Sequence, residues 1–212
     1  MNKFPLVQII DTLNSMFTCF NTKFYDGKLD QPVITVSPDQ RKLALGWCTC
    51  WKAWKEDGTD GYYEINMCAE HLNRPFLDIC ETLLHEMVHL FNLQEGVKDC
   101  SRGNTYHNKR FKEAAEAHGL NCERHEKYGW TITTLTEATA EWLKKAYGNA
   151  PNAFTIFRDS KVKSTTPGKK NSKSRKYVCP ECCAIIRATK EVRVICADCG
   201  VEFKEEGGDN NV

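Results

Sequence analysis

The chain has 212 residues, of which 41% are hydrophobic, 10% aromatic and 27% charged, a composition typical of one sizeable globular core with a small appendage. Twenty-nine Lys and Arg against 28 Asp and Glu leave a formal charge of +1, which excludes a uniformly basic nucleic-acid coat and confines any basic surface to part of the molecule. No stretch approaches the ~18 consecutive apolar residues of a membrane span, and the first segment has no cleavage signal. We therefore expect an intracellular protein, cytoplasmic or in the nucleoid or nucleus, without a membrane partner, whose 12 Cys are thiols or metal ligands.

The first predicted element is an amphipathic helix at the start of the chain, where apolar residues from Leu6 to Phe20 recur at helical spacing up to a turn signal at residues 25–28. Three short stretches rich in β-branched and aromatic residues follow, at Val33–Val36, Leu43–Trp51 and Tyr62–Met67. Together they predict a small, mostly antiparallel sheet.

Three more helices are predicted downstream. They span Phe76–Asn92, Asn108–His118 up to Gly119, and a stretch from a capping box of Thr134 and Glu137 to Tyr147, ended by Gly148. The helix at 76–92 has a wide apolar face, so we expect it to be buried.

That buried helix contains the sequence His85-Glu86-Met87-Val88-His89. Two imidazoles four residues apart lie on one helix face and can bind one zinc ion together. Glu86 points about 100° round the helix and can act as a general base on water without ligating the metal. The alternative is a pair of core histidines with hydrogen-bond partners and an incidental Glu.

A catalytic zinc takes three protein ligands, so a third must come from elsewhere in the chain. His107 follows His89 by 18 residues and lies at the start of the next predicted helix, close enough for the chain to fold back. His118 and His125 are the alternatives. The group that stabilises the transition state stays open among Tyr63, Tyr106, His125 and Tyr128.

Two C-x-x-C pairs near the C-terminus predict a second, structural zinc site. Cys179 and Cys182 precede Cys196 and Cys199, with β-prone residues between the pairs. Four thiolates close a tetrahedron, and the ion would hold together a segment too short for a core of its own. Cys183 is out of register, so we expect it to be an unligated thiol.

Residues 158–176 carry eight Lys and Arg against one Asp and read as a flexible basic linker. Such charge can neutralise phosphates without reading a base sequence, so the stretch is either a contact for DNA, with single-stranded DNA as one form, or a solvated spacer. The candidate DNA contacts are Lys169, Lys170, Lys173, Arg175, Lys176, Arg187 and Arg193.

The chain resembles the SprT-like, or Spartan, family of metalloproteases. The resemblance is carried by Phe24–Leu29, Tyr63–Asn66, Thr82–His89, His107 with Phe111 four residues later, and the cysteine ribbon after a basic stretch. It implies that His85, His89 and His107 bind the catalytic zinc and that Glu86 is the catalytic base. The family usually has Gly after the third histidine; this chain has Asn108, which tolerates a left-handed backbone.

By this resemblance the fold is α+β: a zincin-like metalloprotease domain over 1–157, a linker over 158–176, a zinc ribbon over 177–204 and an acidic, disordered tail over 205–212. The cofactors are two Zn²⁺, one catalytic and one structural, and a monomer is favoured. The expected substrates are DNA-bound or DNA-crosslinked proteins, held as an extended strand against the edge at Tyr62–Met67. The rival hypotheses are a non-proteolytic nucleic-acid-binding regulator and a general peptidase whose ribbon only contacts proteins.

Overall fold

The computed structural model describes residues 4–38, 44–148, 154–159 and 175–206. The chain divides into two compact units, Met1–Ser160 and Lys161–Val212. Within the described residues, the first unit is α+β, with small sheets and four α-helices. None of the helices in that part of the chain combines the length and apolarity that crossing a bilayer requires.

The helices of the first unit are close to those predicted. They are α1 (Pro5–Phe24), α2 (Phe76–Gln94), α3 (Lys109–Ala117) and α4 (Glu137–Tyr147), with a short 3₁₀ turn η1 at Ala69–His71. Pro5 occupies the first turn of α1, where its missing N–H costs nothing. The predicted cap of α4 was wrong by two residues, because the hydroxyl of Thr136, not Thr134, accepts the N–H of Thr139.

The first sheet consists of β1 (Val33–Ser37), β2 (Gly46–Cys48) and β3 (Glu64–Cys68), in the order β1-β3-β2. β3 pairs in parallel with β1 and antiparallel with β2, so the prediction of a mostly antiparallel sheet is wrong for one of the two pairings. Because β3 lies in the centre, both of its sides are hydrogen-bonded. The predicted exposed edge at Tyr62–Met67 is therefore wrong, and β2 is the edge strand nearest α2.

A second sheet was not predicted. It contains β4 (Cys100–Ser101), β5 (Tyr106–His107), β6 (Leu120–His125) and β7 (Gly129–Leu135), in the order β4-β5-β7-β6. β6 and β7 form an antiparallel hairpin whose register shifts between Glu123 and His125. Most side chains of this hairpin are exposed or half-buried, so it lacks the apolar alternation that would have marked it in the sequence.

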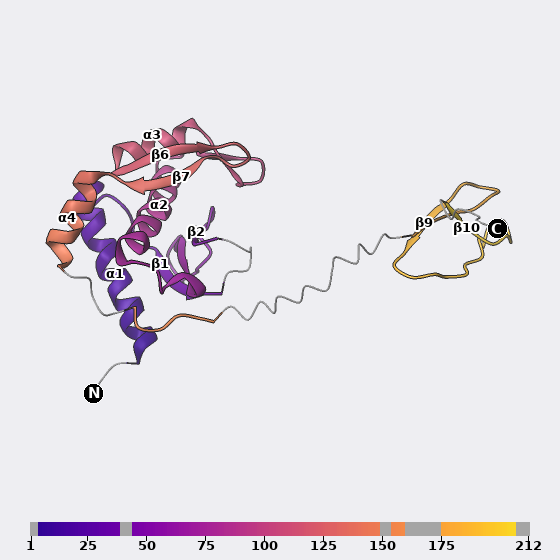
Figure 1. The fold of residues 1–212 in the computed structure, drawn as a ribbon, viewed down its shortest axis with the longest axis horizontal. Helices are drawn as coiled ribbons and strands as arrows, with labels where there is room; N and C mark the ends of the chain where they lie inside the picture. The colour runs from indigo at the N-terminus through magenta and orange to yellow at the C-terminus, as the bar shows by residue number, and fades with distance from the viewer. Residues whose placement is uncertain (1–3, 39–43, 149–153, 160–174, 207–212) are drawn as a thin grey trace. The chain divides into compact units, whose positions relative to one another are not determined.

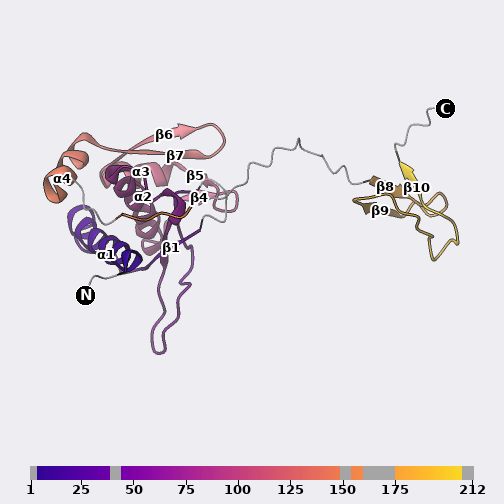
Figure 2. The same ribbon diagram turned by 60° about the horizontal axis from the view of Figure 1, so that its bottom comes forward.

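Helix α2 contacts both sheets and is the centre of the first unit (Figure 1). Its apolar side chains Ile79, Leu83, Leu84, Met87 and Leu90 are completely buried and join Ile9, Leu13 and Phe17 of α1 in one core. The segment between β2 and β3 extends away from this body in Figure 2 and is closed by a bridge between Trp54 and Tyr62. The His85-Glu86-Met87-Val88-His89 motif thus lies on a helix whose apolar side chains are buried in the core.

The second unit contains β8 (Arg175–Val178), β9 (Ile185–Ala188) and β10 (Lys204–Glu206), antiparallel in the order β10-β8-β9. Residues 175–176 of the predicted linker lie in β8, and residues 205–206 of the predicted tail lie in β10. The rest of the predicted tail and residues 160–174 of the predicted linker lie outside the described residues. At the start of that linker, the guanidinium of Arg158 is 2.6 Å from the carboxylate of Glu70.

Candidate active site and metal centres

Helix α2 and strand β5 bring three imidazoles together. The Nε2 atom of His107 lies 3.3 Å from Nε2 of His85 and 3.1 Å from Nε2 of His89. The three ligand atoms form one of the potential metal-binding groups of the described residues. The ring of Phe111 lies under all three, with centroid separations of 4.7, 4.7 and 4.6 Å, so its packing sets how closely the imidazoles approach.

The two alternative histidines lie elsewhere. His118 stacks on Tyr25 at 4.2 Å, and its Nδ1 atom is 2.6 Å from the carbonyl of Ala114. His125 accepts hydrogen bonds from the backbone N–H groups of Lys127 and Tyr128. Neither belongs to the histidine group, so the geometry favours His107 as the third ligand.

Asn108, at the usual Gly position of the family, has φ −92°, so no left-handed backbone is needed there and that expected role is wrong. Its side chain instead caps α3, where it accepts the N–H groups of Arg110 and Phe111, and it donates to the carbonyl of Lys98. Asn is among the residues preferred at this position. The cap holds the start of α3 directly after His107.

Two of the three imidazoles are oriented by outer partners that sequence reasoning missed. His89 Nδ1 lies 2.7 Å from the carboxylate of Asp99, which also accepts a 3.1 Å hydrogen bond from Asn92. His85 Nδ1 lies 3.0 Å from the hydroxyl of Thr133, and this hydroxyl donates to the carboxylate of Glu81. Each arrangement directs Nε2 toward the centre of the group and fixes the tautomer that a metal requires.

The ionisation of the three imidazoles differs. Burial lowers the pKa of His107 to about 4 and lowers the pKa of His85 well below its ordinary value. Burial also disfavours the charged form of His89, but hydrogen bonds to Asp99 and Cys100 outweigh it and raise that pKa to about 10. A metal at the centre would therefore displace a proton from the His89 side of the group.

Glu86 is buried beside the imidazoles, with 6% of its surface exposed. Burial raises the pKa of its carboxyl to about 7, against the opposing effects of His89 and of a hydrogen bond from the Cys48 backbone. A Cβ at Gly46 would lie 2.8 Å from the Asn66 carbonyl and 3.3 Å from Cγ of Glu86. The absence of a side chain at Gly46 thus lets β2 lie directly against the face of α2 that carries Glu86.

Two cavities meet at Glu86. One, of about 440 Å³, is lined by His89, His107 and the β2 side from Trp47 to Trp51. The other, of about 310 Å³, is lined by His85, Glu81 and residues 45–46 and 131–133. None of the four side chains considered as transition-state stabilisers lines either cavity.

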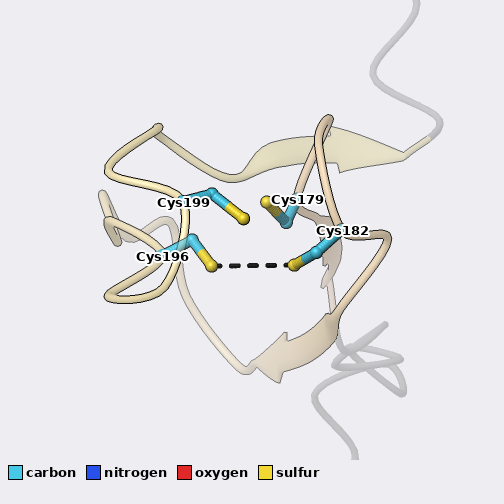
Figure 3. A group of neighbouring side chains, drawn as sticks. All are labelled: Cys179, Cys182, Cys196 and Cys199. Carbon is cyan, nitrogen blue, oxygen red and sulfur yellow. Dashed lines mark hydrogen bonds between the residues drawn. The ribbon is translucent and has the colours of Figure 1, made fainter.

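The four cysteines of the second unit also converge. Figure 3 shows the thiols of Cys179, Cys182, Cys196 and Cys199 pointing toward one centre, and the Sγ atoms of Cys182 and Cys196 are 3.7 Å apart. The backbone N–H of Cys182 lowers the pKa of the Cys179 thiol to about 7, which favours a thiolate. Cys183 is exposed and is not part of the group.

The donor sets of both groups fit zinc. Three imidazole nitrogens with a carboxylate beside them are the set of a catalytic site that keeps one position open. Four thiols within reach of one another are the set of a closed structural site, compatible with a zinc ribbon. The Nε2 atoms of the histidine group face one another rather than separate hydrogen-bond partners, which is the arrangement that a shared cation resolves.

The predicted DNA contacts give a different result. Arg175 forms an ion pair with Glu205 at 3.0 Å, Lys176 pairs with Glu206, and Arg193 pairs with Glu202 at 2.7 Å. Arg187 is on β9. Lys169, Lys170 and Lys173 lie outside the described residues.

A model described as the SprT-like family matches residues 13–131, which include α2, His107 and α3. That family is a metalloprotease-like group. No curated protein and no solved structure matches the chain.

Proposed function

Because the chain belongs to the SprT-like family, we propose that it is a zinc-dependent metalloendopeptidase of the His-Glu-x-x-His type with a zincin-like catalytic unit. The observation that carries the proposal is the convergence of three Nε2 atoms from α2 and β5 beside a buried carboxylate. Structural histidines with ordinary hydrogen-bond partners would not need to face one another in this way.

The roles follow from the positions of the side chains. His85, His89 and His107 would hold the zinc, which would supply the Lewis-acid chemistry of peptide hydrolysis. Glu86, whose pKa is about 7, is poised to take a proton from water near neutral pH and return it to the leaving amine. The Cys48 backbone contact and the close approach of Gly46 hold its carboxylate in place.

The substrate would lie along β2. The N–H of Thr49 donates to Glu64, and the carbonyl of Leu45 accepts from Cys68, so these residues face β3. In an antiparallel pair the backbone groups alternate, which turns Gly46 and Cys48 toward the opposite side, the side of Glu86. An extended peptide added there would pass Glu86 and place alternate side chains in the two cavities.

DNA-bound or DNA-crosslinked proteins are the proposed substrates. Support comes from the family and from the basic stretch 158–176, which would raise the local concentration of protease on DNA. An intracellular location in the cytoplasm, nucleoid or nucleus belongs to the same proposal. In it the ribbon zinc has a structural role only.

The test is cleavage of a DNA-binding protein by wild type and Glu86→Gln, with and without single-stranded DNA. We expect DNA-stimulated cleavage by wild type, and loss of cleavage in Glu86→Gln with zinc content unchanged. Glu113→Gln, an exposed carboxylate of α3, is the matched control and should cleave like wild type. Full zinc content with no cleavage by wild type would instead favour the non-proteolytic regulator, and cleavage indifferent to DNA would favour a general peptidase.

A further inference from the structure

A groove of about 290 Å³ on the first unit has no part in the proposed chemistry. It is lined by Tyr106, Asn108, Lys109, Arg124 and Trp130, and we call it the α3 groove. Tyr106 and His107 are neighbours on β5, and successive side chains of a strand point to opposite faces. The side chain of Tyr106 therefore points away from the histidine group, and the other residues that line the α3 groove come from the start of α3 and from β6 and β7.

Two of the cations at this groove, Lys109 and Arg124, are not neutralised, whereas Lys112 beside it lies 3.6 Å from the carboxylate of Glu116. Among the described residues, neither Lys109 nor Arg124 has a carboxylate within ion-pair distance, and the same holds for Arg102 beside them; no acidic residue lines the groove. Arg175, Lys176 and Arg193 of the second unit, in contrast, are paired with glutamates. Unpaired cations that converge on a hollow favour an anionic ligand.

Aromatic rings are held in the same groove. Lys112 lies 4.4 Å from the ring centre of Trp130, and the guanidinium of Arg102 lies 4.7 Å from that of Tyr106. A Cβ at Gly129 would be 2.9 Å from the Tyr106 ring, so this glycine makes room for the ring. Each ring thus has a cation over one face, and Trp130 is half-buried with part of its side chain packed against the core.

The strand register explains why Trp130 and Arg124 meet. Glu123 pairs with Ile132 and His125 with Gly129, so Arg124 alone faces the two residues Trp130 and Thr131. This is a β-bulge, a device that redirects a side chain and is frequent at functional sites. Here it brings an indole and a guanidinium to one wall of the α3 groove.

We propose that the α3 groove binds single-stranded nucleic acid, with Lys109 and Arg124 on phosphates and Trp130 and Tyr106 against bases. Cations beside aromatic rings are the recurrent means of binding unpaired strands, because every base has a face to stack. An acidic peptide would use the cations but would not require the rings. The proposal rests on the proposed function for its DNA partner and is independent of peptide hydrolysis.

The first test is binding of a labelled single-stranded oligonucleotide to the full chain at about 50 mM salt, where phosphate contacts weigh most. We expect Lys109→Ala/Arg124→Ala to weaken binding roughly tenfold or more and to flatten its salt dependence. Trp130→Leu should weaken it roughly fivefold or more through lost stacking. The control is Lys144→Ala/Lys145→Ala, two exposed cations of α4, which should bind like wild type.

The second test maps the contact in the wild-type chain, so it does not depend on a variant folding. Ultraviolet crosslinking of a bromouracil-substituted strand, followed by mass spectrometry, should label the peptides that contain Tyr106 or Trp130. Crosslinks confined to residues 158–206 together with unchanged binding by the groove variants would overturn this proposal and leave the proposed function intact. Equal competition by polyglutamate of the same charge would also overturn it, because the rings would then contribute nothing.

Failure of the proposed function would look different. Wild type that binds the strand through the groove but cleaves no protein would refute the protease and keep the groove. Wild type that binds no single strand at all would refute the groove and the DNA partner together, whatever its proteolysis.

Discussion

Replacing Thr133 by Val tests whether the partners outside the histidine group control metal affinity. The hydroxyl of Thr133 lies 3.0 Å from Nδ1 of His85 and donates to Glu81, and Val keeps the shape while removing both hydrogen bonds. Loss of such a partner costs roughly 10–100-fold in metal affinity, or about 1.4–2.7 kcal/mol. The zinc-free protein should also lose about 1–3 kcal/mol of stability, because Glu81 is left without its donor.

The assay is zinc transfer to a chromophoric chelator. Two sites predict two phases of release, and Cys179→Ser identifies the phase that belongs to the thiol group. Thr133→Ser keeps the hydroxyl and should restore affinity, while Thr134→Val, at an exposed neighbour on β7, should change nothing. An unchanged histidine-site phase in Thr133→Val would refute the reasoning that Glu81 and Thr133 orient His85.

Three further predictions concern stability. Cys183 has φ +58°, whereas the equivalent position after the second cysteine pair is Gly200 at φ +71°. Cys183→Gly should relieve the left-handed strain and stabilise the ribbon by about 0.5–1 kcal/mol after the flexibility of Gly is subtracted, measured as resistance to chelator-induced unfolding. A destabilised ribbon would contradict this. Gly46→Ala should lower the free energy of unfolding in urea by about 1–3 kcal/mol and reduce the cleavage of protein substrates, because the new methyl group meets the Asn66 carbonyl and Glu86. Wild-type values for both would count against the close packing of β2 on α2. Burial lowers the pKa of His118, opposed by the Ala114 carbonyl and the charge of Asp26, so the unfolded chain binds the proton more readily and stability should fall as pH falls below about 6.5. In His118→Phe, which keeps a ring against Tyr25, the free energy of unfolding should fall less between pH 7.5 and 5.5 than it does in wild type. The same pH dependence in both proteins would refute this role of His118.

The sequence predicted the elements whose signals are local. Helix α2 was predicted at 76–92 and is observed at Phe76–Gln94, because its apolar period and its His-Glu-x-x-His motif lie within a few consecutive turns. The two cysteine pairs were predicted for the same reason, since their spacing alone specifies a knuckle. The cap of α4 was missed by two residues, because Thr134 and Thr136 are equally plausible until the backbone is known.

The partners of the histidines could not be predicted, because they come from elements whose placement depends on tertiary structure. Thr133 reaches His85 across 48 positions, and only the pairing of β7 with β5 and β6 brings it there. The order β1-β3-β2 is also non-local, since β3 inserts between two earlier strands. Because this insertion is not visible in the sequence, the strand at Tyr62–Met67 was predicted to be the exposed edge for an extended peptide. The edge strand beside Glu86 is β2.

The pairing of charged side chains could not be predicted from the sequence either. Counting residues directed attention to 158–176 and the ribbon, yet the register of β8 with β10 places Arg175 and Lys176 beside Glu205 and Glu206. Between residues 175 and 206 six cations are balanced by six acids, so the ribbon has no net charge with which to attract phosphate. Lys109 and Arg124 lie in a stretch of mixed charge that no count would select, but the fold separates them from its acids and directs them into one groove. Whether a cation can bind phosphate therefore depends on whether an acidic side chain already pairs with it. Removing the unpaired cations of the α3 groove should change the salt dependence of nucleic-acid binding more than removing the paired cations of the ribbon.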